Sequence, residues 1–151
     1  MSDARWFEIE AAVAAAVRHF AGASTIFAQI PGAADRYLVE MAFMHAMLAG
    51  QTSLETALLR ILELYGEEAP TGSRWHADLV RRAANAVGSR PPVLEGEVAA
   101  AADETRRFRS VSAHAYDSFD HTRATKAVEG AVLLATRLAS EIARFRQISD
   151  P

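Results

Sequence analysis

Apolar residues recur at intervals of three and four along almost the whole 151-residue chain. Such a repeat places apolar side chains on one face of an α-helix, whereas the strict alternation typical of a half-buried strand is rare here. Only five prolines and eight glycines interrupt the pattern, and alanine, the best helix former, is abundant. The sequence therefore predicts an all-α protein, an up-down bundle of about five helices with short connections.

Glycine and proline predict where the first helices end. The first helix is expected from about Asp3 to Phe20, because Gly22 follows it. Residues 24–30 are expected to form one short helical turn before the Pro31-Gly32 pair. A second helix is expected over about Ala33–Leu48.

The start of a third helix depends on Gly50. Thr52-Ser-Leu-Glu55 matches the capping-box pattern that opens a helix. Glycine inside a helix costs only about 1 kcal/mol, however. The sequence therefore leaves open whether the second and third helices are separate or continuous.

Three further segments complete the expected bundle. Ser73 is expected to cap a short helix that carries Trp75 and ends before Pro91 and Pro92. A fifth segment is expected over Val93–Tyr116, followed by a turn and a final helix capped by Asp120 or Thr122.

Each expected helix has an apolar stripe that predicts its share of the core. The stripes are Trp6, Ile9, Val13, Val17 and Phe20; Tyr37, Met41, Met44 and Leu48; Leu54, Leu58, Ile61, Leu62 and Tyr65; Leu94, Val98, Ala101, Thr105 and Phe108; and Val128, Val132, Ala135, Leu138, Ile142 and Phe145.

Composition indicates one globular domain over residues 1–151, since half of the chain is apolar and 23% is charged. The absence of cysteine excludes disulfides and thiolate metal sites. An acidic N-terminus and the lack of an uninterrupted apolar run of about 18 residues predict a cytoplasmic protein without a membrane span. The net charge of −3 implies that any contact with RNA is local.

The segment Phe108-Arg109-Ser-Val-Ser-Ala-His114-Ala-Tyr116 holds the strongest functional candidates. Five helical steps separate Arg109 from His114, which corresponds to about 140° around the helix axis. Both side chains could reach one phosphate only if the helix ends or bends nearby, or if two protomers share the site.

From about Thr52 to Phe145 the chain resembles the HepT-like toxins of the HEPN superfamily, whereas residues 1–50 match only in being helical. The landmarks of the resemblance are Ser53-Leu-Glu55, Pro70-Thr-Gly-Ser-Arg-Trp75-His76, Arg90-Pro91-Pro-Val, Phe108-Arg109-x4-His114-x-Tyr116 and Glu141-Ile-Ala-Arg-Phe145.

The resemblance implies an HEPN-like bundle that cleaves RNA without a metal or any other cofactor. It assigns Arg109 to stabilise charge on the phosphorus and His114 to act as general acid and base. The family often carries a second histidine directly after the arginine and an arginine directly before the histidine. Ser110 and Ala113 occupy those positions here, so Ser110 is predicted to be a supporting residue.

Two further residues have a functional and a structural interpretation. By the resemblance, Glu55 orients Arg109 across the bundle; as a capping-box carboxylate it would have only a structural role. Tyr116 corresponds to the residue that can accept AMP from a partner nucleotidyltransferase in HepT systems, or it packs its ring at a helix end.

The resemblance also implies partners: an RNA substrate, a second copy in a homodimer, and a nucleotidyltransferase antitoxin. One alternative is a catalytically weakened HEPN module that binds the nucleotidyltransferase or a nucleotide. A third interpretation is a helical dimerisation protein without a ligand.

The remaining histidines favour structural interpretations. His76 lies next to Trp75 and near Asp78, which suggests a capping or packing residue. His45 lies among three methionines and is expected in the core. His114, Asp117 and His121 lack the spacing of a metal site.

Overall fold

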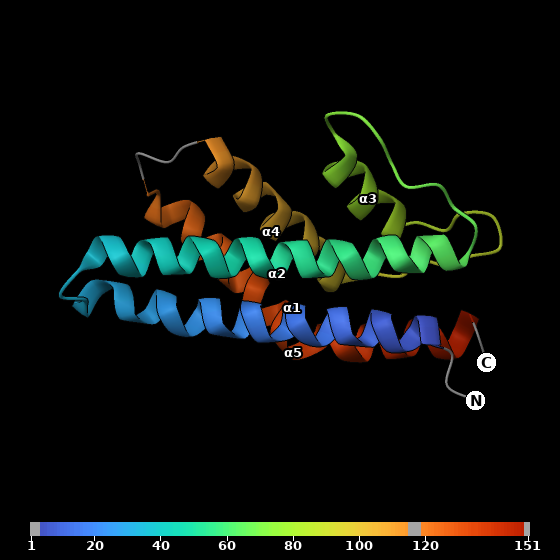
Figure 1. The fold of residues 1–151 in the computed structure, drawn as a ribbon, viewed down its shortest axis with the longest axis horizontal. Coiled ribbons are helices and arrows are strands. Elements are labelled where there is room, and N and C mark those ends of the chain that lie inside the picture. Colours follow the sequence, from blue (N-terminus) through green and yellow to red (C-terminus); the bar gives the residue numbers. More distant parts are fainter. Residues whose placement is uncertain (1–3, 115–118, 150–151) are drawn as a thin grey trace.

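The part of the chain that the structure describes folds into five α-helices and one short 3-10 turn. The computed structural model describes residues 4–114 and 119–149. The elements are α1 (Ala4–Gln29), η1 (Ile30–Gly32), α2 (Arg36–Leu64), α3 (Trp75–Ala83), α4 (Gly96–His114) and α5 (His121–Ser149). The predicted all-α bundle of about five helices is confirmed (Figure 1).

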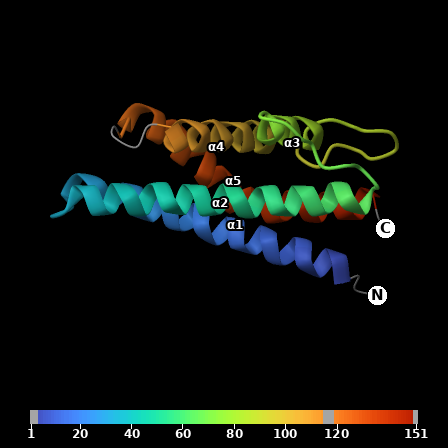
Figure 2. The ribbon, with the colours of Figure 1, turned by 45° about the horizontal axis from the view of Figure 1, so that its top comes forward.

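The helices form a bundle in which α1 lies on one side and α3 and α4 on the other. The helix α1 packs along α2 and α5, and α4 packs mainly along α5. The views in Figures 1 and 2 agree that α2 lies between α1 and the layer formed by α3 and α4. The short helix α3 contacts both α2 and α4, so these three helices meet at one place.

The helix α1 is longer than the sequence predicts, because Gly22 does not end it. A Cβ atom at Gly22 would meet nothing within 4 Å, and the chain reaches no proline until Pro31. A single glycine that is not accompanied by a proline or another turn-forming residue does not end a helix, and it costs about 1 kcal/mol relative to alanine. The expected end at Phe20 and the separate turn at residues 24–30 are therefore wrong.

The helix α2 runs without interruption through Gly50, which answers the question that the sequence left open. Its N-cap is Asp35, whose side chain accepts a hydrogen bond from the backbone N–H of Leu38 at 3.2 Å. Thr52 and Glu55 lie in the middle of the helix, so the capping-box interpretation of both residues is wrong. Glu55 is consequently available for contacts with other helices.

Close packing of α1 on α2 depends on Gly50. A Cβ atom there would lie 2.7 Å from Cε1 of the Phe20 ring. The Phe20 side chain is fully buried, so it has no space into which it could move. Glycine at this position therefore allows the two long helices to approach each other.

We expect Gly50→Ala to destabilise the protein by about 1–3 kcal/mol, the usual cost of overpacking a core, despite the better helix propensity of alanine. Gly22→Ala is the matched control. It lies on the helix that contacts Gly50 but faces open space, so it should stabilise by about 0.5–1 kcal/mol. Urea denaturation followed by circular dichroism measures both, and two changes of the same sign would contradict this account.

The first half of α2 buries a different face from the one that the sequence predicts. Phe43 and Met47 are buried, whereas Tyr37 and Leu38 are 68% and 61% exposed. His45 is also exposed, so its expected place in the core is wrong. Both sets of apolar residues have helical spacing, and periodicity alone cannot tell which set faces α1.

The buried face of α4 and the start of α5 agree better with the prediction. All five residues of the stripe that includes Phe108 are buried. Asp120 caps α5, accepting hydrogen bonds from the backbone N–H groups of Thr122 and Arg123 at 3.0 and 3.2 Å. Val132, which the sequence predicts in the core, is 42% exposed. The residue of α5 that faces α4 here is Gly130, where a Cβ atom would lie 3.2 Å from the Ala101 carbonyl oxygen.

The position of α3 depends on Arg90, whose side chain is almost completely buried. It pairs with Glu67 and donates hydrogen bonds to the carbonyl oxygens of Asn85, Pro91 and Arg82 at 3.0–3.3 Å. These contacts tie the loop after α2 to the loop after α3. The helix itself begins after Arg74 and ends at Ala83, and Ser73 does not cap it as expected.

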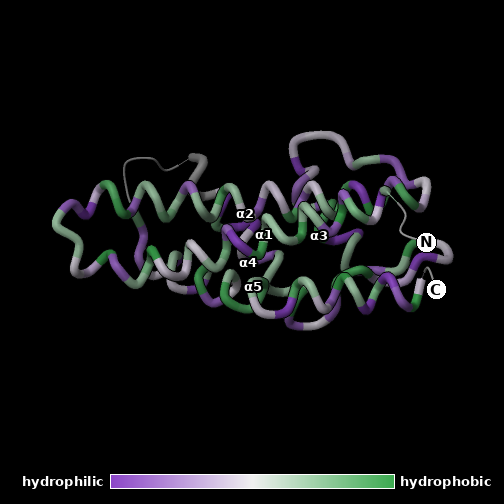
Figure 3. Tube along the Cα trace, turned by 60° about the horizontal axis from the view of Figure 1, so that its bottom comes forward, coloured by the Kyte–Doolittle hydropathy of each residue, from purple (hydrophilic) through white to green (hydrophobic). Residues whose placement is uncertain are grey.

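One helical segment, Ala4–Gly32, is long and apolar enough to cross a membrane by length and composition. Alanine provides much of this hydropathy, and the large side chains Trp6, Ile9, Val13 and Phe20 are buried in the bundle. Figure 3 shows hydrophobic and hydrophilic stretches alternating along the helices. This is the pattern of helices that pack one face against their neighbours.

Candidate active site

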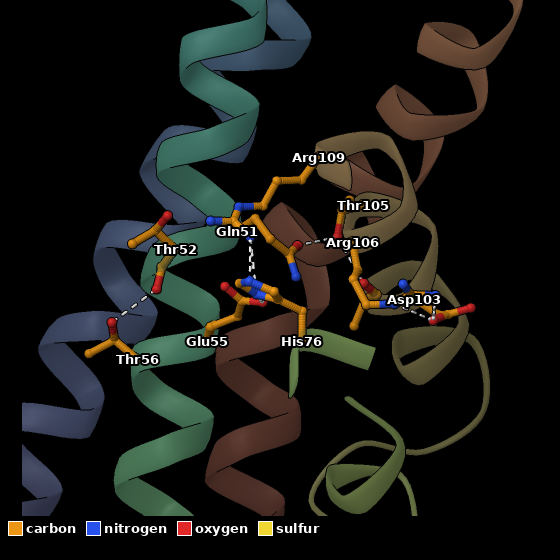
Figure 4. Close-up of polar contacts among 10 residues, drawn as sticks. Gln51, Thr52, Glu55, Thr56, His76, Asp103, Thr105, Arg106 and Arg109 are labelled. Carbon is orange, nitrogen blue, oxygen red and sulfur yellow. Dashed lines mark hydrogen bonds and ion pairs between the residues drawn. The ribbon is translucent and has the colours of Figure 1, made fainter. Parts of the chain in front are cut away.

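A buried carboxylate lies where α2, α3 and α4 meet. Glu55 is almost fully buried on α2, and its Oε2 atom lies 2.6 Å from Nδ1 of His76, the second residue of α3. An isolated charge in such a place is costly, so it requires a close polar partner. His76 provides that partner, and Figure 4 shows the two side chains pointing toward each other.

Arg109 of α4 reaches the same cluster from the other side. Its Nη1 atom lies 3.0 Å from Nδ1 and 3.0 Å from Nε2 of His76. Because Cε1 lies between the two ring nitrogens, equal separations this short place Nη1 against the face of the ring instead of in its plane. The imidazole of His76 also contacts the indole of Trp75, and the centroids of the two rings lie 3.6 Å apart.

Glu55 therefore reaches Arg109 through His76. This arrangement brings together the two residues that the resemblance associates, but with a histidine between them. A second hydrogen bond links the same helices, from Thr105 Oγ1 of α4 to Gln51 Oε1 of α2 at 2.7 Å. It lies one helical turn before both Glu55 and Arg109, so it restrains the position of α4 relative to α2.

Arg109 retains hydrogen-bonding capacity. A guanidinium has five N–H donors, and its only polar contact among the described residues is with the face of the His76 ring. The Nε atom is buried without a partner. The neighbouring Phe108 is buried and contacts the ring of Phe43 with centroids 5.6 Å apart, which anchors α4 beside the guanidinium.

A pocket of about 690 Å³ opens beside this cluster. Its lining combines cationic, hydroxyl and apolar side chains from α2, α3, α4 and the loop before α3. The lining residues are Leu48, Ser73, Arg74, His76, Ala77, Arg106, Arg109 and Ser110. Among the described residues, none that lines the pocket is a carboxylate, so this part of the lining suits an anionic ligand.

Some of the predicted site residues lie at the pocket, whereas others fall outside the described residues. Arg109, Glu55 and Ser110 lie in or beside the pocket, and Ser110 is exposed there. His114 is the last residue of α4, but its side chain and all of Tyr116 lie outside the described residues. The helix is continuous from Arg109 to His114, so these two positions lie about 140° apart around its axis.

His76 is the residue that the sequence interpretation missed. It does not cap α3, and Asp78 pairs with Arg81 instead of with His76. Its position in the Trp75-His76 landmark was the available signal, but spacing along the chain cannot show that α3 faces Glu55. Within the described ranges, no group of three or more histidine, aspartate or glutamate residues could hold a metal ion.

The fold and the site define an all-α bundle with an arginine-centred polar cluster at the junction of three helices. A sequence model of the family described as HepT-like protein matches residues 42–149. The chain therefore belongs to the HepT-like family, a family of HEPN-type toxins. A search of curated proteins finds no match, and neither does a search of solved structures.

The cluster predicts energetic coupling between Glu55 and His76. His76→Ala leaves the buried carboxylate without its partner, which should cost about 1–3 kcal/mol of stability. In the Glu55→Gln background the same substitution should cost less, because a buried neutral amide loses less than a buried carboxylate when its hydrogen-bond partner is removed. A double-mutant cycle measured by urea denaturation should give a coupling of at least about 0.5 kcal/mol.

His45→Ala is the control for this cycle, since His45 is exposed on α2. It should change stability by no more than about 0.5 kcal/mol. Additive effects of the substitutions at residues 55 and 76 would show that the contact contributes nothing to the fold.

Proposed function

We propose that this protein is a metal-independent endoribonuclease toxin of a toxin–antitoxin pair. The observation that carries the proposal is the placement of Arg109. This arginine of the R-x4-H-x-Y segment lines a pocket whose described lining residues include no carboxylate, and several of its N–H donors remain available to a ligand. Membership in the HepT-like family supports the same class of activity.

The proposed reaction uses the 2′-hydroxyl of RNA as the nucleophile. The 2′-oxygen attacks the adjacent phosphorus, its proton passes to a base, and the bond from phosphorus to the 5′-oxygen breaks as that oxygen gains a proton. The products are a 2′,3′-cyclic phosphate and a free 5′-hydroxyl. His114 exchanges the protons, since imidazole titrates near neutral pH. Arg109 stabilises the additional negative charge on the phosphoryl oxygens.

The other residues act through Arg109. Glu55 and His76 hold the guanidinium at the wall of the pocket, which reduces the reorganisation needed when phosphate arrives. Ser110 follows Arg109 on an exposed part of the same wall, where its hydroxyl can donate to a phosphoryl oxygen. Glu55 and His76 are positioning residues in this scheme.

The proposed partners are a second copy of the chain and a nucleotidyltransferase antitoxin. An exposed apolar stripe on α2, which includes Tyr37, Leu38 and Leu48, leads to the pocket and supports association of two copies. Two protomers could then combine Arg109 and His114, whose positions lie about 140° apart around the axis of one helix. The antitoxin would transfer AMP from ATP to the hydroxyl of Tyr116, with release of pyrophosphate, and so add an anionic group to the segment that follows Arg109.

A second candidate is a catalytically weakened module that binds the nucleotidyltransferase or a nucleotide. Ser110 favours it, because the family often places an imidazole at this position of the pocket wall. The two candidates differ in whether the purified protein cuts RNA.

We expect expression of the wild-type chain to slow bacterial growth, and His114→Ala to relieve this effect. The purified protein should cut RNA in the presence of EDTA and leave 2′,3′-cyclic phosphate ends. Loss of a general acid/base typically lowers the rate about 10²–10⁴-fold, and Arg109→Ala should lower it about 10²–10³-fold. Rates from a labelled oligoribonucleotide measure both effects.

Arg107→Ala is the matched control, because Arg107 lies on the same helix, is exposed and does not line the pocket. It should retain nearly full activity. Equal toxicity of the wild type and the His114→Ala variant would exclude the proposed catalytic role. Binding of nucleotide without cleavage at any pH tested would favour the second candidate.

A further inference from the structure

The pocket concentrates positive charge in a protein that is acidic as a whole. The chain has 19 acidic residues against 16 lysines and arginines, yet among the eight described residues that line the pocket three are arginines and none is acidic. A concave site lined by charges of one sign focuses the electric field and attracts a ligand of the opposite sign. The proposed reaction uses only one of these arginines, Arg109.

Arg106 is held in place on the wall of the pocket. Its Nε and Nη2 atoms lie 2.9 and 2.8 Å from Asp103 Oδ1, and only 19% of its side chain is exposed. The same carboxylate also pairs with Arg107, at 3.1 Å from Nε. One negative charge therefore serves two guanidinium groups, which leaves a positive excess. Arg106 lies three residues before Arg109, on the same face of α4.

Arg74 contributes to the lining from the position that precedes α3. It is exposed at the start of α3 and forms no ion pair in the part of the chain that the structure describes. Its side chain is therefore available to a ligand. Leu48 and Ala77 provide apolar surface between the cationic groups, and about 690 Å³ is within the range of pockets that hold small ligands.

We infer that Arg74 and Arg106 form a second phosphate-binding subsite, which holds a backbone phosphate of the RNA strand next to the phosphate at Arg109. This inference rests on the proposed function for its choice of ligand. Contacts of this kind fix the position of a strand without reading its sequence. They explain how an acidic protein binds RNA locally, through a few arginines instead of an overall basic surface.

The test measures binding separately from cleavage. Fluorescence anisotropy with a short 2′-O-methyl oligoribonucleotide follows binding of a strand that lacks the attacking hydroxyl and cannot be cut. Arg74→Gln and Arg106→Gln should each weaken binding several-fold. Each should also lower the slope of log K against log salt by about 0.7, the value for one phosphate contact on a single strand.

Two arginines serve as matched controls. Arg81 lies on α3, the helix that Arg74 precedes, and Arg107 lies on α4 and shares Asp103 with Arg106, but neither is among the residues that line the pocket. Both control variants, Arg81→Gln and Arg107→Gln, should keep the wild-type slope. Equal slopes in the pocket and control variants would overturn the subsite, provided that circular dichroism shows all four variants folded.

Failure of the subsite can be told apart from failure of the proposed function. If the wild type binds the uncut strand with the predicted dependence on Arg74 and Arg106 but never cleaves RNA, the subsite stands and the nuclease proposal falls. Isothermal titration with AMP and with inorganic phosphate identifies the source of the phosphate. The assignment to an RNA backbone would be overturned if the protein bound AMP as tightly as the strand and if Arg74→Gln and Arg106→Gln abolished the binding of AMP as well.

Discussion

The burial of one carboxylate constrains the whole site. Glu55 lies in the middle of a long helix and is almost fully buried, where an unpaired charge would cost several kilocalories per mole. His76 satisfies this charge from α3, and Arg109 of α4 packs on the histidine. Three helices must therefore meet at this residue. The contact that satisfies the carboxylate also holds the guanidinium at the edge of the pocket.

Two kinds of packing support that junction. Arg90 is buried among Glu67 and three backbone carbonyl oxygens, and it positions α3, a helix of only nine residues that could not hold its place alone. Glycines bring the long helices close together: Gly50 admits the ring of Phe20, and Gly130 lies against the backbone of α4. The site is polar, but its geometry depends on small residues elsewhere in the bundle.

The sequence predicted the helical class and most of the core. It failed where local patterns had more than one physical solution. Thr52-Ser-Leu-Glu55 fits a capping box and equally fits the middle of a helix, and Gly22 fits a helix end and equally a tolerated glycine. On α2 two sets of apolar residues have helical spacing, and the structure buries the set that includes Phe43 and Met47 instead of the set that the sequence favoured. His76 seemed to be a packing residue because its partners are 21 and 33 positions away.

By itself the sequence determined that this chain is all-α, that apolar periodicity fills its core, and that Arg109 and His114 stand five residues apart near the end of a helix. The family follows from the sequence as well. Only the tertiary structure decided which face of α2 is buried, that Glu55 pairs with His76, and that Arg74, Arg106 and Arg109 share a pocket. The reason is physical: helical periodicity specifies which residues share a face, whereas the neighbour of that face depends on contacts between distant segments.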